Sequence, residues 1–245
     1  MGSFFVVLQQ AGRRCVVILF FTGWVSSGVE AAGDLVRNDR RNGLIQQGDT
    51  LLFRVELDRI SVAREAVENL VYRYLGAEKR DLVIEEKIQS RQGKLKSYSI
   101  RQNQTGLVGS MSVTGNEVVY TKSQNGHTAT RRVTASLDLP YVAGPQIGEF
   151  LRTHAEELKK NKKIRFLLPV LERSESIEFE IERRDEIVHE MRPASGIYQL
   201  FVRKVLIELD PRTGRIHQIH GRILPLVQRG SSWESAEATT IYQGA

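Results

Sequence analysis

Apolar and polar residues alternate along much of this chain. In the segment DTLLFRVELD, Leu51, Phe53, Val55 and Leu57 occupy one set of alternate positions, and Thr50, Arg54 and Glu56 belong to the other set. A period of two places these side chains on one face, which predicts a half-buried β-strand. SIEFEIERR, later in the chain, shows the same alternation. Residues 62–75 fit a helical stripe as well as a strand, so both alternatives stay open there.

Residues 81–135 predict a meander of antiparallel strands. Short β-branched or apolar runs are separated there by the turn signals Gln92-Gly93, Gly115-Asn116 and Asn125-Gly126. Asn-Gly is the strongest of these, because a two-residue primed turn needs positive φ at both central positions. Near the other end, KVLIELDPRTGRIHQIHGRI predicts two strands joined by a turn over residues 210–214.

One segment, VAGPQIGEFLRTHAEELKKNKK (residues 142–163), predicts a helix. Pro145 suits the first turn, where its missing N–H costs nothing. Spacings of three and four place an apolar stripe on one face, formed by Ile147, Phe150, Leu151, His154 and Leu158. The segment ends in Lys159, Lys160, Lys162 and Lys163. These lysines are typical of a solvated helix end, where cations complement the dipole, and a contact with an anionic lipid head group is the alternative.

The N-terminal region has the features of a secretory signal. Arg13 and Arg14 precede an apolar run from Cys15 to Val25, which is too short to cross a membrane as a helix. Small residues then predict cleavage between Ala31 and Ala32. A buried core helix or an uncleaved anchor are the alternatives. We therefore expect an exported protein, periplasmic or secreted.

These patterns divide the chain into four parts. We predict a signal peptide over residues 1–31, a loose leader over 32–48, a single β-rich domain over 49–228 and a loose polar tail over 229–245. The single cysteine, Cys15, falls in the signal, so the mature chain has no disulfide or thiolate site. The net charge of +6 is compatible with anionic partners without selecting among them.

The familiar catalytic motifs are missing from the sequence. It has no GxxxxGK[ST], GxGxxG, HExxH or GxSxG pattern. His154 shares the apolar stripe, which favours a packing role. His217 and His220 lie three apart, on opposite faces of a strand, which argues against a shared metal. A solvated strand face accounts for the acidic run Glu178, Glu180 and Glu182. We therefore predict no catalytic residue, no metal site, no cofactor and no enzymatic activity.

Four short motifs in the second half resemble a known family. They are Gly144-Pro145 at a helix start, Leu171–Arg173 at a strand end, Arg192–Ser195 before a short helix and Gly221-Arg222 closing a hairpin. Over residues 81–225 the chain resembles a family of uncharacterised exported bacterial proteins. That family is distantly similar to periplasmic lipoprotein carriers and outer-membrane lipoprotein receptors.

The resemblance implies a mainly β (α+β) fold, a curved antiparallel sheet or unclosed β-barrel with a few helices across its concave side. The strand pattern agrees, since a meander with few helices must bury one sheet face. The resemblance also implies an apolar cavity for acyl chains. Its candidate lining residues are Ile147, Phe150, Leu151, Ile177, Phe179, Ile181, Val205, Ile207 and Leu209, with Lys159, Lys160, Lys162 and Lys163 as the anion contact.

Three functions remain open on this basis. The first is binding of a lipid or other apolar ligand in the bacterial envelope. The second is a structural or assembly role in the envelope, through a sheet edge or the basic surface. The third is a hydrolase with an unrecognised site. We expect a lipid or an envelope protein as the partner, membrane contact that is at most peripheral, and no nucleic acid.

Overall fold

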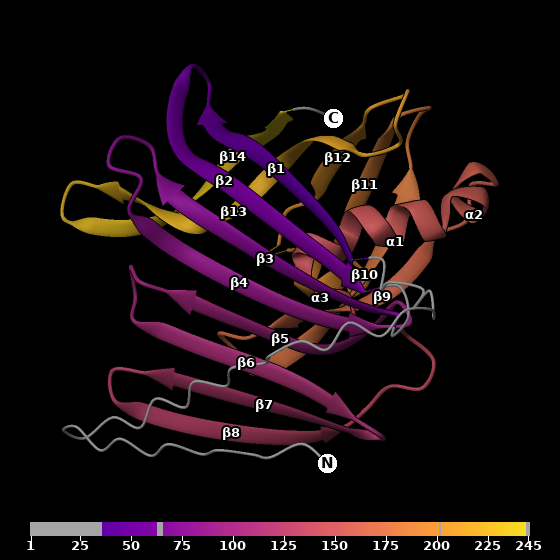
Figure 1. The fold of residues 1–245 in the computed structure, drawn as a ribbon, viewed down its shortest axis with the longest axis horizontal. Coiled ribbons are helices and arrows are strands. Elements are labelled where there is room, and N and C mark those ends of the chain that lie inside the picture. Colours follow the sequence, from indigo (N-terminus) through magenta and orange to yellow (C-terminus); the bar gives the residue numbers. More distant parts are fainter. Residues whose placement is uncertain (1–35, 63–65, 201, 244–245) are drawn as a thin grey trace, which may run out of the picture. The chain divides into compact units, whose positions relative to one another are not determined.

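The computed structural model describes residues 36–62, 66–200 and 202–243. They form one compact unit, in which strands are joined by short turns and a few short helices (Figure 1). The strands are β1 (Val36–Gln47), β2 (Thr50–Val62), β3 (Val67–Gly76), β4 (Leu82–Arg91), β5 (Lys94–Gln102), β6 (Leu107–Thr114), β7 (Glu117–Gln124), β8 (His127–Thr134), β9 (Ile164–Val170), β10 (Glu175–Arg183), β11 (Val188–Pro193), β12 (Val205–Leu209), β13 (Ile216–Arg229) and β14 (Ser232–Gln243). The helices are η2 (Gly144–Gln146), α1 (Ile147–Thr153), α2 (Ala155–Lys159) and α3 (Gly196–Gln199).

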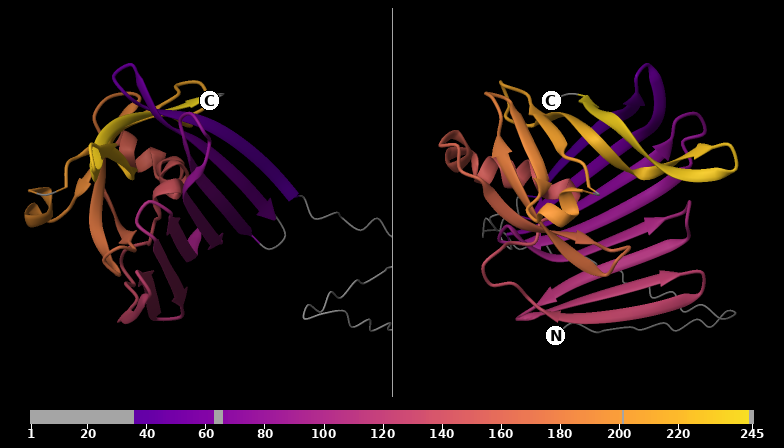
Figure 2. Two further views of the ribbon diagram at one scale, coloured as in Figure 1. Left: turned by 90° about the vertical axis from the view of Figure 1, so that its left-hand side faces the viewer. Right: turned by 180° about the vertical axis from the view of Figure 1, so that it is seen from behind.

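All fourteen strands belong to a single antiparallel sheet. The order across it is β8-β7-β6-β5-β4-β3-β2-β1-β14-β13-β12-β11-β10-β9. The sheet curls so that α1 lies on its concave side, while β8 and β9 remain its two edges (Figure 2). The predicted fold class, a curved unclosed barrel with few helices, is confirmed.

The prediction of a loose leader and a loose tail was wrong. Residues of both segments form β1 and β14, which pair with each other near the middle of the sheet, with Gly43 opposite Tyr242. A side chain at Gly43 would meet the carbonyl oxygen of Ile241 at 3.0 Å, so glycine permits this close pairing. Both strands were overlooked because most of their inward residues are small or polar, and only Ile45 and Tyr242 near their ends are large and buried.

Two local predictions can be settled from the backbone. Of the ambiguous residues 62–75, Val62 ends β2 and residues 67–75 are extended, because they pair with both β2 and β4. The Asn125-Gly126 turn has φ of 53° and 79° at its two residues, as a primed two-residue hairpin requires. The hairpin between β7 and β8 is therefore confirmed.

The predicted single helix over residues 142–163 is divided into pieces. The backbone leaves helical geometry at His154, with φ −102° and ψ 14°, which ends α1 and begins α2. The apolar stripe is nevertheless buried, with Ile147, Phe150 and Leu151 from α1 and Leu158 from α2. His154 is half-buried, packs its ring 4.5 Å from that of Phe150, and its Nδ1 lies 3.0 Å from a carboxylate oxygen of Glu157.

Side chains, rather than a backbone ladder, bridge the gap between the two ends of the sheet. Leu171, just after β9, packs against Gly109 of β6, where a Cβ atom would lie only 2.8 Å from the Leu171 Cβ. The Tyr120 hydroxyl of β7 lies 2.6 Å from the Ser176 hydroxyl of β10. Lys122 donates to the Glu172 carbonyl at 2.8 Å. The curled sheet thus encloses one continuous apolar core.

Two further points concern membranes and export. None of the helices in the described part of the chain has the length and apolar character needed to cross a membrane. The predicted signal peptide and its cleavage site at Ala31 and Ala32 lie outside the described residues.

Candidate functional site: an arginine-lined cleft

The residues predicted to line an acyl-chain cavity form packed core instead. Seven of the nine are buried, and Val205 and Leu209 are half-buried against the same core. Phe166 contacts Phe150 with ring centroids 5.0 Å apart and Phe179 with centroids 6.2 Å apart. None of the nine lines either of the two cavities that the structure describes. The prediction that they face the sheet interior holds, but side chains fill that interior.

The predicted anion contacts also point elsewhere. Lys159 pairs with Glu156 at 2.7 Å on the surface of α2. Lys163 pairs with Glu180 at 3.1 Å and with Glu182 at 3.4 Å on the outer face of β10. The prediction of a solvated face for the acidic run of β10 is therefore wrong at Glu180, which is buried and paired with both Lys163 and Arg192. None of the predicted lysines lines a described cavity.

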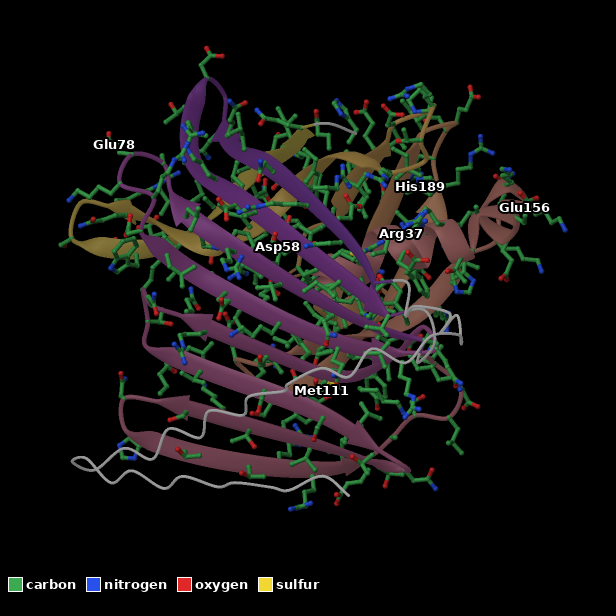
Figure 3. The ribbon with its side chains drawn as sticks, in the orientation of Figure 1. Arg37, Asp58, Glu78, Met111, Glu156 and His189 are labelled. Atoms are coloured by element: carbon green, nitrogen blue, oxygen red, sulfur yellow. The ribbon has the colours of Figure 1, made fainter. Side chains whose placement is uncertain are left out.

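A cleft of about 920 Å³ lies where the concave face of the sheet meets the beginning of α1. Its walls come from strands at both ends of the chain, β1 to β4 on one side and β13 and β14 on the other, with η2 and α1 across them. Figure 3 labels Arg37, which lines the cleft on β1, and Asp58 on the adjacent strand β2, which does not. The predicted leader contributes Arg37, Asn38, Asp39 and Arg41 to the cleft, and the predicted tail contributes Tyr242.

Strand alternation places the cleft residues on one face. In β1, Arg37, Asp39 and Arg41 point inward at a period of two. Directly opposite them on β2 are Ser61, Arg59 and Leu57, respectively. Further along the same two strands this face carries Ile45 and Val55, which are buried in the core. The inward face thus changes from polar in the cleft to apolar in the core.

Positive charge exceeds negative charge in the cleft. Five arginines line it, namely Arg37, Arg41, Arg59, Arg152 and Arg215, against the three carboxylates Asp39, Glu68 and Glu149. The carboxylates are shared among three of the arginines: Arg59 bonds Glu68 at 3.0 Å and Glu149 at 3.5 Å, Arg215 bonds Asp39 at 3.4 Å, and Arg152 pairs with Glu149. Arg37 makes no ion pair within the part of the chain that the structure describes.

Arg41 is the most constrained of these cations. One Nη donates to the Ile216 carbonyl at 2.9 Å, and the guanidinium lies 5.1 Å from the centre of the Tyr242 ring. Its Nε is buried and has no hydrogen-bond partner among the residues that the structure describes. Burial lowers the pKa of Arg41, and the nearby charge of Arg215 lowers it further. An anion placed here would meet an unsatisfied donor and a cation that lacks a carboxylate at bonding distance.

Buried tyrosines form the floor beneath Arg41. Tyr72 and Tyr242 line the cleft, and their hydroxyl groups contact each other. Next to Tyr72, Glu86 of β4 is fully buried and accepts hydrogen bonds from Tyr98 at 2.5 Å and Tyr74 at 3.1 Å. Burial raises the pKa of Glu86 to about 7 despite these two donors. The floor therefore contains a carboxyl group that is largely neutral in mildly acidic solution.

The remaining lining is apolar, which makes the cleft amphipathic. Large aliphatic residues of β2, β3 and β13 contribute to it, namely Leu57, Val62, Val67, Ile216 and Ile219. Among the described residues that line the cleft, none is a histidine or a cysteine. The arrangement suits binding of a molecule with an anionic end and an apolar body.

The sequence did contain a signal for these arginines. Arg37, Asp39 and Arg41 lie at alternate positions in VRNDRRNGLIQQ, and Ile45 continues the same face. A search for alternating apolar residues misses this strand, because only its final inward position is a large apolar residue. Charged residues at alternate positions before an apolar run were the available clue.

Comparisons with known proteins add little beyond the fold. No protein-family model matches the chain, and no curated protein does either. Among solved structures, it is similar to a crystal structure of a β-barrel-like protein of a domain of unknown function, DUF1849, from Brucella abortus. The identity is 10% and the TM-score 0.44, over 84% of this chain and 94% of that chain. A relationship to the lipoprotein carriers stays a prediction.

Proposed function

We propose that this protein binds a single-chain amphipathic anion, such as a fatty-acid carboxylate, in the arginine-lined cleft. The observation that carries the proposal is the combination of two cations without a carboxylate partner, Arg37 and Arg41, with an apolar lining in the same cleft. Its volume of about 920 Å³ falls within the range of small-molecule sites.

The charged end of the ligand would bind at Arg41 and Arg37. A guanidinium group offers several N–H donors in one plane, which match the two oxygens of a carboxylate or phosphate. The unpartnered Nε of Arg41 would gain an acceptor, and the lowered pKa of this side chain would rise toward its ordinary value. Because Arg41 is half-buried, the interaction would be screened less than a surface ion pair.

The tail of the ligand would lie along the apolar lining. Leu57 and Ile219 are only half-buried, so they still have apolar surface to cover. Each methylene buried there contributes about 0.8 kcal/mol. Ordering a flexible chain offsets part of this gain. This ligand agrees with the acyl-chain site that the resemblance to exported lipoprotein-carrier-like proteins implies, although other side chains would form it.

A pair of adjacent arginines provides a matched test. Arg41 points into the cleft, while Arg40 points outward, where it pairs with Glu56 at 3.2 Å and Asp58 at 3.3 Å. Arg41→Gln and Arg40→Gln remove the same charge from neighbouring positions of one strand. With a fluorescent fatty acid as the probe, we expect Arg41→Gln to weaken binding about tenfold or more, as loss of a charged hydrogen bond does. Arg40→Gln should bind like the wild type.

Two results would reject the proposal. One is the absence of saturable fatty-acid binding by folded wild-type protein. The other is equal weakening by the two arginine variants, which would indicate a general charge effect. Leu57→Asp tests the apolar part, because a carboxylate beside Arg41 would compete with the anion and remove apolar lining. Its folding is checked by circular dichroism before binding is measured.

An assembly role is a second candidate, and the sheet edge favours it. All residues of β8 except Val133 are exposed, and no strand pairs with its outer side among the described residues. Free edges can accept a strand from another protein. Arg131 and Arg132 lie on this edge, however, and charged edges commonly prevent such pairing. A photo-crosslinker at Thr130 should give a discrete adduct in the native host that one at Ser99 on β5 does not. Identical patterns would reject this role.

A further inference from the structure

The segment between β11 and β12 presents large apolar side chains to solvent. Ile197 is 71% exposed and Leu200 is 80% exposed. They are three residues apart around the short helix α3, and the Leu200 N–H donates to the Ile197 carbonyl. Exposed aliphatic side chains that lie close together can mark an interaction site.

Other residues of the same segment fix it to the body of the protein. Tyr198 and Val202 are half-buried and pack against the apolar core, and the Val202 N–H donates to the Tyr198 carbonyl at 2.8 Å. Gln199 donates to the Pro193 carbonyl at 2.7 Å, which ties the segment to the end of β11. One side of the segment is therefore anchored, and Ile197 and Leu200 are held on the other side.

Cations surround this apolar pair, and their carboxylate partners lie deeper. Arg203 pairs with Glu237 at 3.0 Å, and Lys204 pairs with Glu190 at 3.1 Å. The Arg203 side chain is 79% exposed and that of Glu237 37%, while Glu190 is buried. Arg173 lies over the Tyr198 ring and is itself more exposed than its partner Glu175. A flat anionic surface would meet the cations before the carboxylates.

We propose that Ile197 and Leu200, with the cations beside them, dock the protein on an anionic phospholipid surface. Ile197 and Leu200 would enter the boundary between head groups and acyl chains, and Arg203, Lys204 and Arg173 would contact lipid phosphates. Apolar insertion and electrostatic attraction reinforce one another in such peripheral contacts. The contact is separate from the arginine-lined cleft, because none of these residues lines it. The proposal therefore does not depend on the proposed function.

Vesicle co-sedimentation of the full chain tests the docking. We expect wild-type protein to sediment with vesicles containing phosphatidylglycerol, and far less with phosphatidylcholine vesicles. Ile197→Ser with Leu200→Ser should reduce the bound fraction about tenfold or more, as removal of two inserted side chains predicts. Leu137→Ser is the matched control, because Leu137 is 84% exposed at a different place on the surface. It should sediment like the wild type.

Two further variants separate the sources of binding. Arg203→Gln should lower the bound fraction and make it less sensitive to salt, since one phosphate contact is lost. Arg41→Gln, in the cleft, should leave sedimentation unchanged, whereas the Ile197/Leu200 double variant should leave fatty-acid binding unchanged.

Several outcomes would overturn the docking proposal. They are no sedimentation of the wild type, equal binding to both vesicle types, or loss of binding in Leu137→Ser to the same extent as in the double variant. A double variant that binds vesicles normally would indicate that the apolar pair serves a protein partner instead, and would also reject the proposal.

Discussion

Glu86 predicts an unusual dependence of stability on pH. This carboxyl is fully buried on the inward face of β4, and burial raises its pKa from 4.5 to about 7. The folded protein therefore keeps a proton that the unfolded chain releases above pH 4.5. Stability from this group is complete at low pH and is lost as the pH rises through about 7, the reverse of an ion-paired carboxylate.

The magnitude follows from the difference between the two pKa values. Each pKa unit corresponds to about 1.4 kcal/mol, so the whole difference amounts to about 3 kcal/mol. Between about pH 5 and about pH 8 the linkage relation gives a loss of about 2 to 3 kcal/mol. Glu86→Gln removes the titrating group, and an amide can still accept a hydrogen bond from Tyr98 or Tyr74. The stability advantage of wild type over the variant should shrink by that amount across this range.

Urea unfolding, followed by circular dichroism at several pH values, measures this difference directly. Other groups contribute to the absolute curves. Burial lowers the pKa of His189, so its contribution is lost as the pH falls, opposite in sign to that of Glu86. Because His189 is present in both proteins, its contribution cancels when wild type and variant are compared.

Glu85 provides the control on the opposite face of the same strand. Lys87 bonds its carboxylate at 2.8 Å and lowers its pKa, so it stays ionised throughout the range tested. Glu85→Gln should therefore differ from wild type by a constant amount between about pH 5 and about pH 8. A constant difference for Glu86→Gln, or the same slope for both variants, would refute the assignment of the buried proton to Glu86.

Three other substitutions test packing and backbone geometry by urea unfolding. Gly109→Val should destabilise the protein by about 1–3 kcal/mol, because the valine side chain would collide with Leu171. Gly196→Ala is the control and should be nearly neutral, because the space around Gly196 is open. Similar losses of stability in both variants would contradict this explanation. Phe166→Ala should cost about 3–5 kcal/mol without changing fatty-acid affinity, since it lies in the core and not in the cleft. Gly126→Ala should cost about 1–2 kcal/mol because φ is 79°; an unchanged stability would refute that reasoning.

Large apolar residues made most of the fold predictable. Ile177, Phe179 and Ile181 alternate strictly, and the structure buries all three on the concave side of β10. The Asn125-Gly126 turn could also be predicted, because few residue pairs readily adopt positive φ at both positions. What local patterns do not encode is the order of strands across the sheet. β1 and β14, the first and last strands of the described chain, pair with each other, and no local pattern predicts a pairing between such distant segments.

The helix prediction shows a different limit. Spacing correctly identified the buried stripe, but the 3.6-residue period continues through His154, where the backbone breaks. A short bend changes the direction of a helix without disturbing which positions are apolar. The four lysines that follow were assigned to an anion site on charge alone. In the structure, Lys159 is paired with Glu156, and Lys163 is paired with Glu180 and Glu182. Glu180 and Glu182 belong to β10, which lies near Lys163 only in the folded protein.

The same physical cause explains why the two missing strands and the site were missed together. A strand that lines the core must show apolar residues at every second position, whereas a strand that lines a water-accessible cleft need not. Along β1, Arg37, Asp39 and Arg41 line the cleft before the inward face reaches the core at Ile45. β14 brings Tyr242 to the same cleft after the small inward residues Ala236 and Ala238. A strand whose inward residues are polar, although the fold places it in the sheet, indicates a functional site. The polar groups on such a face need hydrogen-bond partners, which are water or a ligand. In this protein that reasoning leads to Arg41, whose buried Nε has neither an acceptor nor a carboxylate at bonding distance within residues 36–62, 66–200 and 202–243.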